Sequence, residues 1–203
     1  MEGLFFYWLS WIGWTWATFI MDKKNPARIK IAIWLLAVIM TAPYKVNVFM
    51  YEIHLSAFAI GFFLFAETKR MRAGAFLYSF ISAFIIMLAY TSFLLFELFD
   101  PVWVLFDRKI MIAAAGVYLT LLLQKTYYNR GISLISGLLQ GEILFSTILQ
   151  KYNFPYSVSS LAFLDILIIS LAMLLTWSAI ETLIVTMSGN PINHIEGEEH
   201  KTS

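Results

Sequence analysis

Four ionisable side chains lie within long apolar stretches of the chain, and they are the first candidates for chemistry: Glu52, His54, Glu142 and Asp165. A charged side chain at the centre of a bilayer costs ~2.5 to 3.5 kcal/mol on insertion scales. Such groups are therefore rare in membrane segments, and they often mark proton or ion pathways. We take these four residues as candidates for an intramembrane proton or ion site. A fifth acid, Glu181, is expected close to the cytoplasmic face.

Glu142 and Asp165 are expected at the same depth. Each lies about eight residues from the outer end of an apolar run, which at ~1.5 Å per residue places both carboxyls ~12 Å below the outer surface. Two close carboxylates would share a proton, because both cannot be ionised cheaply. One hypothesis is therefore an outward-facing site for a proton or cation. The other, which we favour, is that each carboxyl is protonated or hydrogen-bonded across a helix contact and only fixes packing.

His54 and Glu52 belong to the apolar run Val46–Ala66. His54 falls at the same expected depth as the two carboxyls, and a neutral imidazole there could accept or donate a proton. Glu52 would lie about a turn nearer the surface. Two residues apart on a helix point in nearly opposite directions, so at most one of this pair would face the site.

Most other membrane chemistries lack the residues that they require. The chain has no cysteine, which excludes disulfides, thiolate metal sites and thiol nucleophiles. His-Glu-x-x-His and Gly-x-Ser-x-Gly motifs are absent, as is a lysine in the run 158–187 for a retinal Schiff base. Outside the C-terminal tail His54 is the only histidine, so paired haem ligands are missing. We expect no metal, no cofactor and no enzymatic activity.

The elements that must position these groups are membrane helices. The chain is 60% hydrophobic and 13% charged with a mean hydropathy of +0.75, far from the composition of a soluble domain. Its net charge of +1 provides no basic surface for nucleic acid. Since a spanning helix needs about 20 mostly apolar residues, the apolar runs predict an all-α polytopic membrane bundle of about seven transmembrane helices. The runs are Gly3–Met21, Ile31–Pro43, Val46–Ala66, Ala73–Phe99, Ile110–Gln124, Gly131–Gln150 and Val158–Met187. The second is short, and it could be a tilted span or one arm of a re-entrant hairpin.

The distribution of Lys and Arg predicts the orientation. The odd-numbered connections and the tail carry 10 of these residues, and the even-numbered connections carry 4. Positive loops stay in the cytoplasm, so the N-terminus is expected outside and the C-terminus inside. We expect a single bundle domain, residues 1–187, and a polar cytoplasmic tail, residues 188–203, with too little apolar surface to fold alone.

Small residues recur at four-residue spacing in two of the runs. Ser133, Gly137 and Gly141 form such a stripe in the sixth run, and Ala75, Ser79 and Ala83 form one in the fourth. Stripes of this kind let another helix backbone approach closely. They predict either packing within the bundle, which we favour, or a contact between two copies of the chain.

The opening of the chain resembles a known family. Met1 to Trp8, the tryptophans of Trp11–Trp14 and the segment Phe19–Lys23 are similar to the start of the YphA-like family, small multi-pass membrane proteins of spore-forming Gram-positive bacteria. The resemblance implies a multi-pass protein of the bacterial plasma membrane, the inner membrane. It assigns no catalytic or binding residue.

These observations predict a non-enzymatic membrane protein that acts through helix–helix contacts. Its expected partners are the lipid bilayer and other membrane proteins or a second copy of itself, in an assembly or regulatory role. The alternative is a small proton- or cation-coupled transporter that uses Glu142, Asp165 and His54. The two hypotheses differ in whether the carboxylates line a wet cavity or are sealed among neighbouring side chains.

Overall fold

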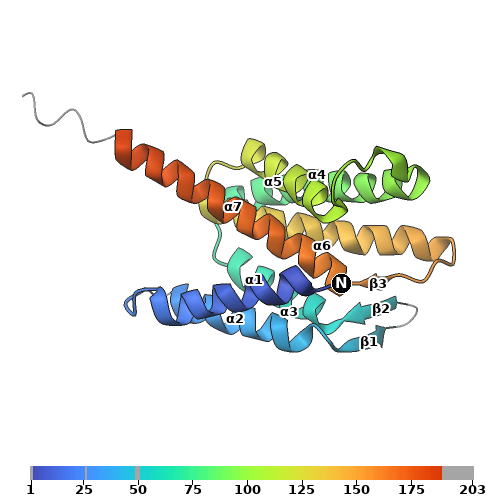
Figure 1. Cartoon of the computed structure of the whole chain (residues 1–203), viewed down its shortest axis with the longest axis horizontal. Coiled ribbons are helices and arrows are strands. Elements are labelled where there is room, and N and C mark those ends of the chain that lie inside the picture. Colours follow the sequence, from blue (N-terminus) through green and yellow to red (C-terminus); the bar gives the residue numbers. More distant parts are fainter. Residues whose placement is uncertain (1, 26, 49–50, 189–203) are drawn as a thin grey trace, which may run out of the picture.

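The computed structural model describes residues 2–25, 27–48 and 51–188. Within these ranges the chain is mostly helical, as predicted, and forms seven α-helices (Figure 1). They are α1 Leu4–Thr15, α2 Ala27–Thr41, α3 Leu55–Thr68, α4 Ala73–Phe99, α5 Arg108–Leu123, α6 Tyr127–Lys151 and α7 Leu161–Ser188. The tail expected from residue 188 lies, apart from its first residue, outside the described residues.

Three helices, α4, α6 and α7, are long and apolar enough to cross a membrane. The predicted run Ala73–Phe99 coincides with α4. The other four are shorter, with 12 residues in α1, 15 in α2, 14 in α3 and 16 in α5. A five-residue π-helix, Trp16–Ile20, extends α1.

A small sheet lies at one end of the bundle, and the all-α prediction omitted it. Strand β1, Lys45–Val48, pairs antiparallel with β2, Tyr51–His54, and β2 pairs parallel with β3, Ser157–Val158. The prediction of a continuous helix over Val46–Ala66 was therefore wrong for its first part. Apolar and polar residues alternate along both β1 and β2, and this period of two favours strands over a helix.

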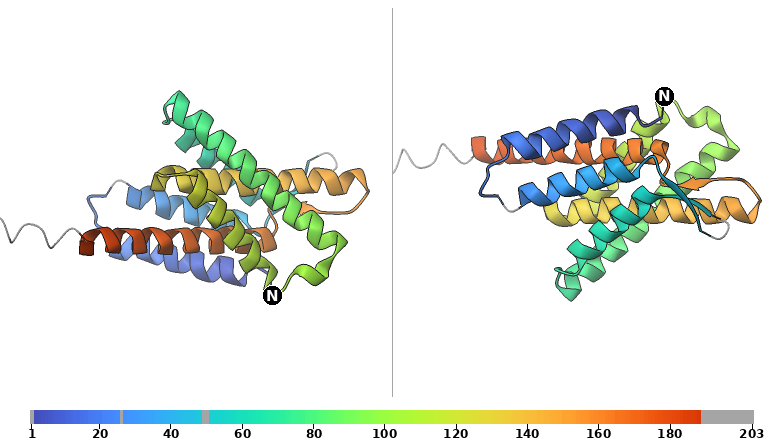
Figure 2. Two further views of the ribbon diagram at one scale, coloured as in Figure 1. Left: turned by 90° about the horizontal axis from the view of Figure 1, so that it is seen from above. Right: turned by 90° about the horizontal axis from the view of Figure 1, so that it is seen from below.

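The helices run alternately in opposite directions. The start of α1, the sheet and the α4–α5 connection lie at one end of the molecule, which we call the sheet end (Figure 1). The α1–α2 connection and the end of α7 lie at the other, which we call the tail end. One short 3-10 helix, Pro101–Trp103, belongs to the α4–α5 connection. Figure 2 shows that α4 crosses the bundle obliquely, whereas α1, α2, α6 and α7 run along its length.

The most extensive helix contact joins α4 to α6. A Cβ atom built on Gly137 would lie 2.7 Å from Cβ of Ile86, and one on Gly141 would lie 2.7 Å from Cδ1 of Tyr90. Both distances are too short for real atoms, so glycine is required where these backbones meet. At the same contact the Ser133 hydroxyl donates to the carbonyl of Ser79, at 3.4 Å. The two small-residue stripes thus face each other inside the bundle.

Candidate functional site

Glu142 lies in the middle of the α4–α6 contact with none of its surface exposed. Its carboxylate accepts a hydrogen bond from Tyr90 on α4 at 2.7 Å and one from Tyr156, in the segment before β3, at 2.9 Å. The neighbouring Gly141 lets the Tyr90 ring lie against α6, which brings the phenol within reach. Among the described residues, no basic side chain forms an ion pair with Glu142. Its polar partners are therefore neutral donors.

Asp165 lies near the start of α7 and is also fully buried. Its two oxygens accept hydrogen bonds from the backbone N–H groups of Gly3 and Phe6, each at 2.8 Å. Oδ2 also accepts a charge-assisted bond from Nζ of Lys109, at 2.5 Å. The first N–H groups of a helix have no partner within it, and the positive end of the helix dipole favours an anion. Asp165 thus caps α1 and joins it to α5 and α7.

The structure does not bring Glu142 and Asp165 together as the sequence hypothesis required. Glu142 bonds to tyrosines, whereas both oxygens of Asp165 are occupied by the start of α1 and by Lys109. Neither carboxyl is a hydrogen-bond partner of the other among the described residues, so this arrangement gives the hypothesis of a shared proton no support. Residue counting estimates the depth of a side chain, but it carries no information about which neighbour the side chain faces.

His54 and Glu52 lie in β2 rather than in a helix, so the helical rise from which their depths were predicted does not apply to them. His54 is 5% exposed, and its Nδ1 lies 2.9 Å from the carbonyl oxygen of Ala42, just after α2. Glu52 is exposed and forms an ion pair with Lys45 on β1, at 3.7 Å. His54 thus connects β2 to the end of α2, and within the described part of the chain neither residue shares a hydrogen bond or ion pair with Glu142 or Asp165.

A pocket of about 470 Å³ opens at the sheet end above Glu142. Its lining includes Glu52, Ser146, Gln150 and Tyr156. Tyr156 lines the pocket and also donates to Glu142, so its side chain connects the two. Burial and the nearby carboxylate raise the pKa of Tyr156 well above its usual value, so the phenol stays a neutral donor. In the described parts of the chain, no three acidic or histidine side chains gather closely enough to hold a metal ion.

Two acids at the tail end also join helices. Glu67, at the end of α3, accepts a bond from the Tyr128 phenol at 2.6 Å and lies 3.5 Å from Nζ of Lys30. Glu181 on α7 pairs with Arg130 on α6 at 2.7 Å and accepts a bond from the indole of Trp177 at 2.6 Å. Glu181 is at the expected end of its helix. Glu67 was not predicted as a site residue, because it lies in a charged cluster that the sequence analysis interpreted as a loop.

A further polar contact at the tail end was not predicted. Gln124 is buried just after α5, and its amide nitrogen lies 3.0 Å from the hydroxyl of Ser82 and 3.2 Å from that of Ser133. Its backbone carbonyl accepts a bond from Nε of Arg130, at 2.8 Å. Of these two serines only Ser133 belongs to a predicted small-residue stripe, and a glutamine at the end of an apolar run gave no signal of its own.

Comparison with known proteins identifies the family. A model described as "YphA-like integral membrane protein" matches residues 2–201. The chain belongs to the YphA-like family. The uncharacterized protein YphA of Bacillus subtilis (strain 168) is 25% identical over 166 residues, which cover 81% of each chain. No solved structure matches significantly.

Membership of the YphA-like family makes this chain an integral membrane protein, as the composition predicted. The family match covers nearly the whole chain, so the resemblance seen at its opening is confirmed well beyond the first helix. In a YphA-like protein the many exposed aromatic and aliphatic side chains have a simple physical account. A bilayer solvates apolar side chains at the protein surface, whereas water does not.

Proposed function

We propose that the chain crosses a bacterial plasma membrane seven times, with its N-terminus outside. The alternating direction of the helices supports this, as does the placement of the positive residues. The connections at the tail end, the helix turns beside them and the C-terminal tail hold 10 Lys and Arg, and the connections and adjoining turns at the sheet end hold 4. The four short helices would span by tilt and local thinning of the bilayer.

Single-cysteine labelling tests this topology, because the chain contains no native cysteine. Lys23→Cys lies in the α1–α2 connection and Phe154→Cys in the α6–β3 connection, and both positions are exposed. An impermeant maleimide should label position 154 in intact spheroplasts and position 23 only after permeabilisation. The reverse pattern would refute the orientation.

We propose that the protein is not an enzyme and acts through its membrane-embedded surface, in the assembly or regulation of membrane proteins. The observation that carries this proposal is how the intramembrane acids are used. Glu142 and Asp165 are each sealed in contacts that join separate helices. The interior polar groups therefore hold the bundle together, and the outer surface is left to interact.

The outer face of α4 is the strongest candidate for that surface. Phe76, Phe80 and Phe84 recur at four-residue spacing and are all exposed, and the rings of Phe76 and Phe80 stack with centroids 6.4 Å apart. Rigid aromatic side chains supply large contact areas at helix interfaces. A partner helix of another membrane protein, or of a second copy, would pack along this stripe.

Site-specific photocrosslinking in the native membrane tests the proposal. A photoreactive amino acid at position 80 should give a discrete crosslinked product, which mass spectrometry would assign to another membrane protein or to a dimer. Leu183 on α7 is also exposed and serves as the control position. If both positions give lipid adducts and no crosslink to a protein, the proposal is contradicted.

The transporter alternative has one specific observation in its favour, the position of Glu142 beneath the outer pocket. In this second proposal the Tyr156 ring moves aside and Glu142 takes up a proton or a monovalent cation. Proteoliposomes loaded with a pH dye should then show flux that Glu142→Gln abolishes and that Glu52→Gln, at the pocket rim, preserves. An absence of flux in the parent protein would refute it.

A further inference from the structure

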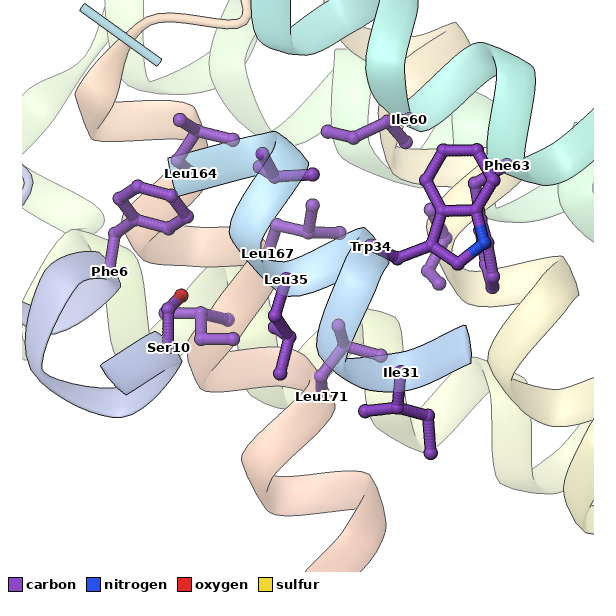
Figure 3. A pocket seen from close by; sticks show the side chains of 13 residues that line it. Phe6, Ser10, Ile31, Trp34, Leu35, Ile60, Phe63, Leu164, Leu167 and Leu171 are labelled. Carbon is purple, nitrogen blue, oxygen red and sulfur yellow. The ribbon is translucent and has the colours of Figure 1, made fainter. Parts of the chain in front are cut away.

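A cavity of about 210 Å³ lies between α1, α2, α3, α6 and α7, away from the buried acids (Figure 3). Its walls are almost entirely hydrocarbon and aromatic side chains. An apolar cavity of ~150 Å³ stays dry and takes up a molecule as large as benzene. This cavity is larger, and so it is suited to an apolar ligand rather than to water.

One hydroxyl in the cavity wall has no hydrogen-bond partner among the described residues. Ser10 of α1 is 1% exposed, and its Oγ is unpaired although it is buried. Figure 3 shows this side chain on the cavity wall, on the side opposite Trp34 and Phe63. A buried polar group without a partner is destabilising, so most are paired in native proteins.

Three other buried helical hydroxyls in this protein are bonded within their own helix, whereas among the described residues Ser10 shares its lack of a partner with Thr18, which is not part of the cavity wall. Ser82, Thr120 and Ser170 each donate to the carbonyl four residues earlier, at 2.9, 2.7 and 2.7 Å. This local bond is the usual solution for serine and threonine inside a helix. Ser10 does not form it, and its hydroxyl remains available to a molecule in the cavity.

The cavity is closed at one end and open at the other. Towards the sheet end its walls are the buried side chains of Phe6, Ile60 and Leu164. Towards the tail end they include Ile31, which is 39% exposed one turn into α2, and the half-buried Leu171. The opening therefore lies along the apolar surface of the helices, where the molecules at hand are lipids.

We propose that this cavity binds a single-chain, lipid-like molecule from the bilayer, with a hydroxyl or carbonyl oxygen hydrogen-bonded to Ser10 Oγ. The hydrocarbon chain enters beside Ile31 and lies against Leu35 and Trp34. The polar oxygen gives Ser10 Oγ the hydrogen-bond partner that it lacks among the described residues. This binding site is independent of the α4 surface and of the pocket above Glu142.

Photolabelling of the full-length protein in mild detergent tests the proposal. The probes are a ten-carbon alcohol that carries a diazirine and the matched hydrocarbon without the hydroxyl. The alcohol should label cavity-lining peptides of α1 and α2 saturably, and more strongly than the hydrocarbon does. Ser10→Ala should raise the alcohol concentration that gives half-maximal labelling about fivefold, the effect of losing one hydrogen bond. The concentration needed for half-maximal labelling by the hydrocarbon should not change.

A cavity-filling variant gives a second test. Leu35→Trp should remove labelling by both probes, whereas Leu183→Trp, on the exposed face of α7, should leave it unchanged. If Leu35→Trp does not fold, the comparison of the two probes in Ser10→Ala decides alone. Equal labelling by both probes in the parent, or a preference for the alcohol that persists in Ser10→Ala, would overturn the proposal.

Discussion

The carboxylate of Asp165 accepts a hydrogen bond from the backbone of Gly3, 162 residues earlier in the chain. With the bonds from Phe6 and Lys109, this contact fastens the first helix to the fifth and the seventh. An acid within an apolar run, which the sequence marks as a candidate for ion transport, is thus the cap of a distant helix. The same carboxylate satisfies orphan N–H groups and neutralises a lysine, two requirements that are severe in a bilayer.

The glycines of the α4–α6 contact should be intolerant of a methyl group. Gly137→Ala would place Cβ against Ile86 and the carbonyl of Ala83, so we expect the free energy of unfolding to fall by about 1 to 3 kcal/mol. Gly61→Ala, in α3 with open space around its Cα, should leave stability unchanged or raise it by up to ~1 kcal/mol. Unfolding with SDS in mixed micelles measures both. Equal effects would contradict the close approach of α4 and α6.

Removing the hydroxyl of Tyr156 should lower the stability of the protein, because Glu142 loses a hydrogen-bond donor. Tyr156→Phe leaves a buried carboxylate with one donor fewer, and we expect a loss of about 1 kcal/mol. Tyr152→Phe, at an exposed position four residues earlier, should have no effect. Because folding raises the pKa of Tyr156, its contribution is complete below the ordinary tyrosine pKa of about 10 and declines at higher pH. Equal stabilities of the two variants between pH 7 and 9 would argue against this role.

The buried amide of Gln124 should contribute more to the free energy of unfolding than a half-buried amide does. Gln124→Leu removes the donor that lies between Ser82 and Ser133, and we expect a loss of about 1 to 3 kcal/mol. The matched control is Gln140→Leu, because Gln140 bonds to Ser136 at a half-buried position of α6. Its effect should stay under about 1 kcal/mol. The same unfolding assay compares them, and a larger loss in the control would be the contrary result.

The sequence predicted the long elements well because their signals are local. The apolar run Ala73–Phe99 is bounded by charged residues on both sides, and it coincides with α4. The hairpin of β1 and β2 was missed because a hydropathy average over Val46–Ala66 hides the alternation along its first residues. Alternation, rather than mean hydropathy, carried the information.

The candidate site was predicted only in part, because partner choice depends on tertiary structure. The burial of Glu142 and Asp165 followed from their apolar surroundings. The partners of Asp165 did not, since one is the backbone at the start of the chain and another, Lys109, reads in the sequence as an ordinary loop cation. The depths predicted for His54 and Glu52 assumed a helix where the chain forms a strand.

The central claim, that the buried acids stabilise the bundle, is tested most directly by a double-mutant cycle on Asp165 and Lys109. The free energy of unfolding is measured in mixed micelles for the parent, Asp165→Asn, Lys109→Met and the double variant. We predict that each single change is destabilising and that the two are coupled by about 1 kcal/mol or more, because they remove the same buried ion pair. Single variants as stable as the parent, or effects that add within about 0.3 kcal/mol, would contradict the claim.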